Sequence, residues 1–138
     1  MPPVKQGPAA GGGSVDEVLS DTLLSTAGTV NVVLVSQEGC PFCTIVRRHY
    51  LKPLAAEGRG RIQVAEVELG SRRRLLGFRS EEITHAEFGK AYGVQFAPTV
   101  MFLGPKGEEL AKRIVGLSQD YFGAYLEAAI DSALAAGR

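Results

Sequence analysis

Two cysteines, Cys40 and Cys43, follow directly on an apolar run, and no other cysteine occurs in the chain. The run Val30–Ser36 is β-branched and apolar on both faces, which predicts a central strand covered on both sides. Cys43–Leu51 can form a helix, which we expect Pro53 to kink or end. A Cys-x-x-Cys at such a strand-to-helix junction can close a small disulfide ring, open it, and exchange it with another protein.

The size and charge of the chain narrow the classes of protein it can belong to. Its 138 residues suit one domain, large enough to bury a core without disulfide staples. With 15 basic and 15 acidic residues the net charge is zero, which does not favour a nucleic-acid binder. No apolar run near the N-terminus approaches the ~18 residues of a membrane span, and no apolar signal-peptide core follows Met1. We expect no metal and no cofactor.

The N-terminal stretch differs in composition from the rest. Residues 1–14 are rich in Pro and Gly, which predicts a disordered linker. Apolar residues at helical spacing then predict an extra N-terminal helix over Val15–Ser25. The folded domain is therefore expected to span residues 15–138.

The remaining pattern predicts an α/β fold. Strands are expected over Ile62–Leu69, Val94–Leu103 and Glu109–Val115. Thr84 and Glu87 form a capping-box pattern that starts a short helix, and Ser118 is expected to cap a final helix over Gln119–Ala135. The first two strands should be parallel neighbours and the last two an antiparallel hairpin. The result is a mixed four-stranded sheet flanked by helices.

This order resembles the thioredoxin superfamily, with Cys40-Pro41-Phe42-Cys43 after the first central strand and Ala97-Pro98-Thr99 at the third. The resemblance covers residues 30–135. Within the superfamily it is nearest to bacterial periplasmic thioredoxin-like proteins, including those of sulfur-oxidation operons. The chain departs from thioredoxin in its Pro41-Phe42 pair, in Gly39 where thioredoxins have Trp, and in Leu34 where they bury an Asp. The segment Gly70–Ile83 is also longer than the family pattern implies.

The chemistry is expected to centre on the two cysteines. Cys40, at the helix N-terminus, is the expected attacking thiolate, and Cys43, one turn inside, the resolving thiol. The resemblance implies a cis Ala97–Pro98 bond packed against the cysteine pair as a second catalytic element. The expected substrate contacts are Gly39, Pro41, Phe42 and Ala97, with Ala97 pairing through its backbone to an extended substrate.

Several charged residues have two interpretations. Glu66 is a candidate proton acceptor for Cys43, on the same strand face as Ile62 and Val64, or else a solvated edge glutamate. Arg47 and Arg48 can promote the thiolate or steer an acidic partner, or simply form a solvated helix face.

Two further features lie outside the motif. His49 and His85 lack the spacing of zinc ligands. The segment Arg72–Arg79, with Leu75, Leu76 and Phe78, is either a docking insert or a segment that packs its apolar residues on the core.

These features predict a thiol–disulfide oxidoreductase that acts on protein substrates, with reduction of the substrate as the expected direction. A glutathione-dependent, glutaredoxin-like enzyme and a redox-switched binding module remain as alternatives. The expected partners are a protein substrate and an electron-donor or acceptor protein, with no nucleic acid and no membrane span. We expect a monomer in the periplasm, with the cytoplasm as the alternative compartment.

Overall fold

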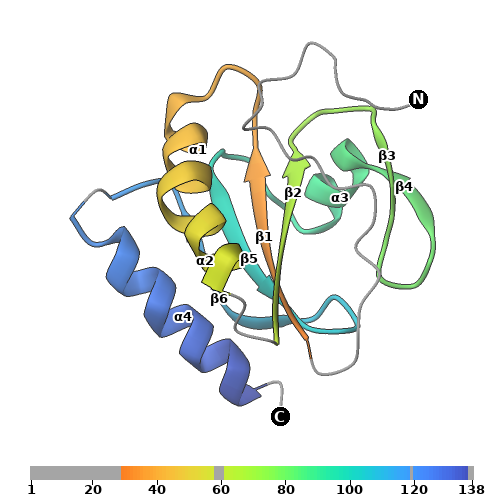
Figure 1. Ribbon diagram of the computed structural model, residues 1–138. Helices are drawn as coiled ribbons and strands as arrows, with labels where there is room; N and C mark the ends of the chain where they lie inside the picture. Colours follow the sequence, from red (N-terminus) through yellow and green to blue (C-terminus); the bar gives the residue numbers. More distant parts are fainter. Residues whose placement is uncertain (1–28, 58–60, 119, 137–138) are drawn as a thin grey trace.

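The computed structural model describes residues 29–57, 61–118 and 120–136. The predicted linker over residues 1–14 and the predicted helix Val15–Ser25 lie outside these ranges. Within them the chain forms a four-stranded sheet with helices on both of its faces, and a separate two-stranded sheet (Figure 1).

The central sheet has the strand order β2–β1–β5–β6. β1 (Val30–Ser36) pairs in parallel with β2 (Ile62–Glu68) and antiparallel with β5 (Thr99–Leu103). β5 pairs antiparallel with β6 (Glu109–Val115) across a turn. The predicted mixed four-stranded sheet, with its parallel first pair and its C-terminal hairpin, is confirmed.

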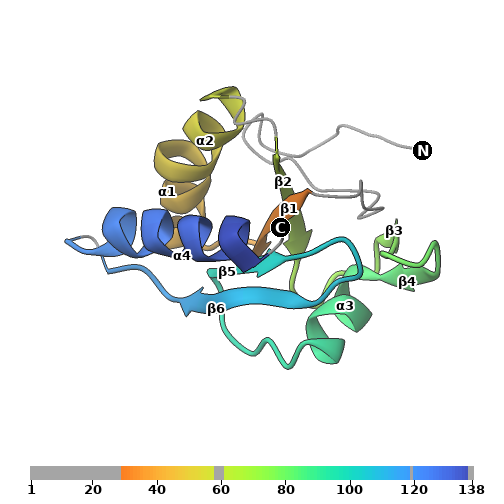
Figure 2. The same cartoon turned by 90° about the horizontal axis from the view of Figure 1, so that it is seen from below.

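Two apolar cores lie on opposite faces of this sheet. Val30, Val32 and Leu34 of β1 pack with helices on one face, whereas Val33 and Val35 pack on the other. The first core includes α4 (Phe122–Ala136), and the second includes α3 (His85–Ala91). Figure 2 shows α3 on the opposite side of the sheet from α1, α2 and α4. Every residue of β1 is buried, as expected for a strand covered on both sides.

The helix after the cysteines continues past Pro53, where the sequence predicted a kink or an end. It runs through α1 (Pro41–Ile45), the π-helical turn η1 (Val46–Leu51) and α2 (Lys52–Glu57). The amide of Lys52 donates to the carbonyl of Arg47, five residues back. Pro53 has no N–H, and its ring crowds the preceding turn of an α-helix. The wider π-turn before Pro53 accommodates the ring, so the helix does not end there.

The long segment after β2 contains a small hairpin that the sequence pattern did not reveal. β3 (Arg74–Leu76) pairs antiparallel with β4 (Glu82–Thr84), apart from the main sheet. Leu75 is buried and Phe78 is partly buried against the second core. Leu75 and Phe78 of this segment therefore pack on the core.

The predicted capping box is confirmed at the start of α3. The amide of Glu87 donates to the Thr84 hydroxyl at 3.0 Å, and the amide of Thr84 donates to the Glu87 carboxylate at 2.7 Å. His85 is fully buried, and its Nδ1 accepts the amide of Glu68 at 3.0 Å. These bonds join the hairpin and α3 to the end of β2.

Two predicted element starts were wrong. The strand expected from Val94 begins at Thr99, because the residues before it form an irregular loop that contains a cis Ala97–Pro98 bond. The final helix begins at Phe122, whose amide donates to the carbonyl of Ser118 at 2.8 Å. No helix among the described residues is long and apolar enough to cross a membrane.

Candidate functional site

The two cysteines lie at the end of β1, where the chain turns into α1. Gly39 has a φ of 75°, a left-handed conformation that glycine adopts without steric cost. The amide of Cys40 donates to the carbonyl of Gln37 at 3.2 Å, which closes the turn. Cys40 is the N-cap residue of α1, and its sulfur is bonded to that of Cys43. The predicted strand–turn–helix setting of the motif is therefore present.

The two sulfurs have different environments. Cys43 is 1% exposed in the first core-facing turn of α1, whereas Cys40 is partly exposed. The amide of Cys43 donates to the Cys40 sulfur at 3.2 Å. The same amide can stabilise negative charge on that sulfur once the disulfide is opened. This asymmetry allows an external thiol or disulfide to reach Cys40 before Cys43.

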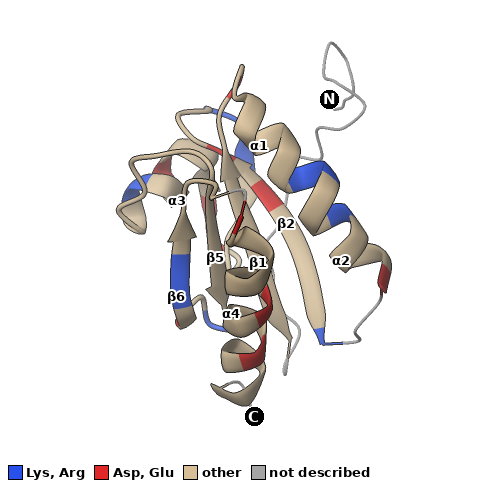
Figure 3. Ribbon diagram, turned by 90° about the vertical axis from the view of Figure 1, so that its left-hand side faces the viewer, with Lys and Arg blue, Asp and Glu red and all other residues tan. Residues whose placement is uncertain are grey.

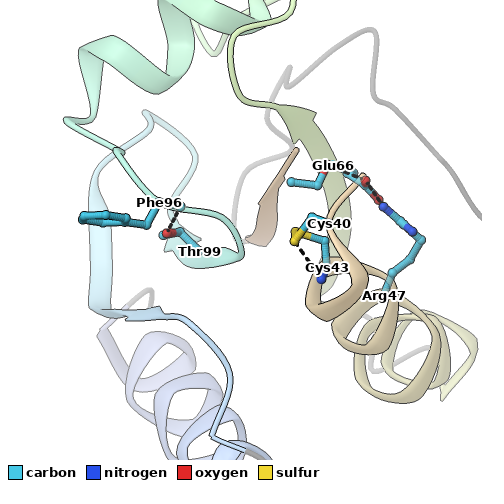
Figure 4. Close-up of a disulfide and its surroundings, with 7 residues drawn as sticks. Cys40, Cys43, Arg47, Glu66, Phe96 and Thr99 are labelled. Atoms are coloured by element: carbon cyan, nitrogen blue, oxygen red, sulfur yellow. Dashed lines mark hydrogen bonds and ion pairs between the residues drawn. A yellow bond between two sulfur atoms is a disulfide. The ribbon is translucent and has the colours of Figure 1, made fainter. Parts of the chain in front are cut away.

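The loop before β5 lies opposite the disulfide. Its Ala97–Pro98 bond is cis, and Pro98 is buried. The Thr99 hydroxyl donates to the carbonyl of Phe96 at 2.7 Å, and the amide of Gly116 donates to the carbonyl of Pro98 at 2.8 Å. Figure 4 shows Phe96 and Thr99 across from Cys40 and Cys43. The fold thus brings together the two motifs that are far apart in the sequence.

Glu66 is buried beside the helix that follows the cysteines. It pairs with Leu34 in the β1–β2 register and is 4% exposed, so the interpretation as a solvated edge glutamate was wrong. Its Oε1 accepts from Arg47 Nε at 2.7 Å, and its Oε2 accepts from Arg47 Nη2 at 2.6 Å. The Ser36 hydroxyl also donates to Oε2, at 2.7 Å. This bidentate pair links the helix to β2 (Figure 4).

Arg47 is buried, so its interpretation as part of a solvated helix face was wrong. It is 8% exposed and belongs to the buried side of the helix, whereas Arg48 beside it is exposed. The spacing could have indicated this burial. Arg47 follows Cys43 by four residues and therefore lies on the same face of the helix. Ser36 was missed altogether, because a small hydroxyl at the end of an apolar strand carries no pattern of its own.

Metal-ligating groups do not converge in the described part of the chain. No three His, Cys, Asp or Glu side chains there form a group that can hold a metal ion. His49 is exposed on the helix and His85 is buried next to β2.

The chain was compared with known proteins. A family model described as a thioredoxin-like domain matches residues 23–130. No match was found among curated protein sequences. A thioredoxin-fold protein from Helicobacter pylori superposes with a TM-score of 0.60 at 12% identity, covering 86% of each chain. The thioredoxin Mala s 13 from Malassezia sympodialis superposes with a TM-score of 0.57 at 15% identity, covering 80% of each chain. At such identities these two structures establish similarity of fold.

Proposed function

Because the chain belongs to the family of thioredoxin-like domains, we propose that it exchanges its Cys40–Cys43 dithiol or disulfide with protein substrates. The observation that carries the proposal is the asymmetric disulfide at the N-terminus of α1. Cys40 is partly exposed and its sulfur accepts an amide hydrogen bond, whereas Cys43 is buried.

In the reducing direction the reaction has two steps. The Cys40 thiolate attacks one sulfur of a substrate disulfide, forms a mixed disulfide, and expels the other substrate sulfur as a thiolate that takes up a proton. Cys43 then loses its proton and attacks the Cys40 sulfur. This releases the second substrate thiol and closes the Cys40–Cys43 disulfide. The protein dithiol is oxidised by two electrons, and the substrate is reduced by two.

The loop before β5 can bind a substrate in extended conformation. Ala97 is only partly buried, and within the described residues its backbone forms no hydrogen bond with another backbone group. A substrate strand can therefore pair with Ala97 while its cysteine lies against Cys40. Gly39, Pro41 and Phe42 supply the facing surface from the other side of the disulfide.

Glu66 is proposed to receive the proton of Cys43, with Arg47 and Ser36 positioning its carboxylate. The support is its burial on the face of the sheet that the cysteine helix covers. Within the family we propose that the chain belongs to the bacterial periplasmic group, on the resemblance of the motifs, and hence that its compartment is the periplasm.

Trapping the mixed disulfide tests the proposal. Cys43→Ser removes the resolving thiol, so the variant should accumulate a covalent adduct with a protein disulfide substrate, detectable by non-reducing gel and mass spectrometry. Cys40→Ser is the matched control and should trap nothing. Absence of both an adduct and substrate turnover by the wild-type protein would contradict an enzyme of this class. Retained turnover by Cys43→Ser with glutathione would favour the glutaredoxin-like alternative.

A further inference from the structure

The β3–β4 hairpin leaves one edge of β3 open. The amide of Gly77 donates to the carbonyl of Glu81 at 2.8 Å, so these two residues form a hydrogen-bonded pair. Such pairs alternate with non-bonded pairs along an antiparallel ladder, so the backbone groups of Leu76 and Arg74 point away from β4. Within the described part of the chain, β3 has no second neighbouring strand, and neither Leu76 nor Arg74 forms a backbone hydrogen bond with another segment. This edge can therefore accept another strand.

The side chains along this edge are basic. Three consecutive arginines, Arg72–Arg74, lead into β3, and all three are exposed. Arg74 forms an ion pair with Glu82 of β4 at 2.9 Å, and the two side chains are 70% and 68% exposed. An ion pair so exposed contributes little to stability, so the Arg74 guanidinium can exchange Glu82 for another carboxylate. The edge thus combines open backbone groups with positive charge that a ligand can reach.

The pattern of side chains on β3 distinguishes between possible occupants. Leu75 is buried in the second core, so Arg74 and Leu76 project from the opposite face of the strand, where Leu76 is partly buried. Charged residues on an open edge commonly prevent proteins from associating with their own copies. A second copy bound here would bring two arginine-rich strands together, and like charges on adjacent strands are destabilising. The same charges favour a strand of opposite sign.

We propose that the open edge of β3 binds an extended acidic segment of a partner polypeptide by strand addition. In antiparallel pairing, an apolar residue of the partner lies opposite Leu76, and an acidic residue two positions later lies opposite Arg74. A second acidic residue, two positions further on, can reach Arg72. The proposal does not depend on the exchange reaction. Figures 1 and 2 show the hairpin on the side of the molecule away from α1, so a segment bound there leaves Cys40 accessible.

Binding of two matched peptides to the full-length protein tests the proposal. The probe is a fluorescent peptide, Thr-Val-Thr-Glu-Thr-Glu-Thr, whose β-branched residues favour an extended chain. The control peptide has Lys in place of both Glu residues. Fluorescence anisotropy at low salt should show that the Glu peptide binds at least about tenfold more tightly than the Lys peptide. Its affinity should fall as added salt screens the charges. Equal affinities for the two peptides would overturn the proposal.

A charge-reversal variant locates the bound peptide. Arg74→Glu should weaken binding of the Glu peptide by about tenfold, because it puts two carboxylates opposite each other on adjacent strands. Lys112→Glu is the matched control, with the same change of net charge at an exposed residue of β6, and should leave the affinity unchanged. Figure 3 shows β6 at the other edge of the main sheet from β2, the strand that precedes the hairpin. Equal losses in the two variants would mean attraction by overall charge and would overturn the proposal.

Amide hydrogen exchange tests the strand pairing itself. The amides of Arg74 and Leu76 should exchange readily in the free protein and become protected with saturating Glu peptide. The same peptide N-methylated at its Val and first Glu should not bind, because those two amides donate to β3. Binding without protection of the two amides would overturn the proposal. Protection already present in the free monomer, or protection that appears with self-association, would do the same, because another segment of this chain or a second copy would then occupy the edge.

Discussion

At the scale of single residues, the most consequential group apart from the cysteines is the buried pair of Arg47 and Glu66. Both oxygens of Glu66 accept from Arg47, and Ser36 adds a third hydrogen bond. A buried charge is tolerated only while it is paired and hydrogen-bonded, so the two residues should depend on each other. The pair also anchors the helical turn after Cys43 to β2. A change that breaks the pair should therefore destabilise the fold and displace the cysteines.

A double-mutant cycle should show this dependence. Glu66→Gln and Arg47→Met are each expected to lower the free energy of unfolding by about 3 kcal/mol, because each removes the charged partner of a buried group. The double variant should lose less than the sum of the two. Urea denaturation of the oxidised proteins measures the loss of unfolding free energy in all three variants. Additive losses, within about 0.5 kcal/mol, would mean that the pair is not coupled.

The same Glu66 variant examines the proposed proton transfer. Glu66→Gln should slow release of the mixed disulfide by Cys43 more than it slows the first attack by Cys40, and should alter the pH dependence of that second step. Ser36→Ala serves for comparison, because it removes one hydrogen bond and leaves the carboxylate in place.

At the scale of elements, Tyr92 joins the end of α3 to the turn between β5 and β6. Its hydroxyl donates to the carbonyl of Gly107, and a Cβ at Gly107 would lie 2.8 Å from that hydroxyl and 2.9 Å from Phe78. Gly107 also has a φ of 83°, so this turn requires glycine for both its conformation and its close packing. Burial raises the pKa of the Tyr92 phenol, and Glu109 and Glu108 raise it further.

This shift predicts a loss of stability in alkali. Above about pH 10 the phenol ionises in the unfolded chain while the folded protein keeps its proton, so unfolding releases a proton and becomes more favourable as pH rises. Tyr92→Phe should be less stable by about 1 kcal/mol at neutral pH, because it loses a hydrogen bond. Above pH 10 the free energy of unfolding of this variant should fall less steeply than that of the wild-type protein. The two curves of stability against pH should therefore converge. Denaturant titrations from pH 8 to 11.5 test this, with the exposed Tyr121→Phe as control; parallel curves would contradict it.

At the scale of the whole molecule, the direction of electron flow depends on which redox state the fold stabilises. The disulfide lies at the junction of the central strand and the helix that covers the first core. By linkage, a fold that stabilises the disulfide form has a low reduction potential, and one that stabilises the dithiol form is an oxidant.

If the protein works in the reducing direction expected from its sequence, it should be more stable when oxidised. Reduction of the Cys40–Cys43 pair should lower the free energy of unfolding, and equilibration with thiol buffers should give a potential near the ~−270 mV of thioredoxin. The double variant Cys40→Ser, Cys43→Ser should not respond to reductant. A more stable reduced form, with a potential towards ~−120 mV, would identify an oxidase instead.

Local physics made much of the fold predictable from the sequence. Val30–Ser36 specified a buried strand, because both of its faces are apolar. Thr84 and Glu87 specified a helix start, because their hydrogen bonds close within four residues. The spacing of Cys40 and Cys43 predicted a redox pair only together with the strand before them, the helix after them and Ala97-Pro98-Thr99 further along the chain.

The tertiary structure alone decided the surroundings of that pair. Arg47 meets Glu66 only because the helix packs across β2, and the two are not neighbours in sequence. The helix continues through Pro53 because of a π-turn, and the formation of that turn depends on packing. The β3–β4 hairpin forms where its apolar residues can pack on the second core. Thus the sequence by itself determined the presence of a closely spaced Cys40–Cys43 pair on a thioredoxin-like fold. Packing decided which charges and which aromatic rings surround it, because those contacts join segments that the sequence holds far apart.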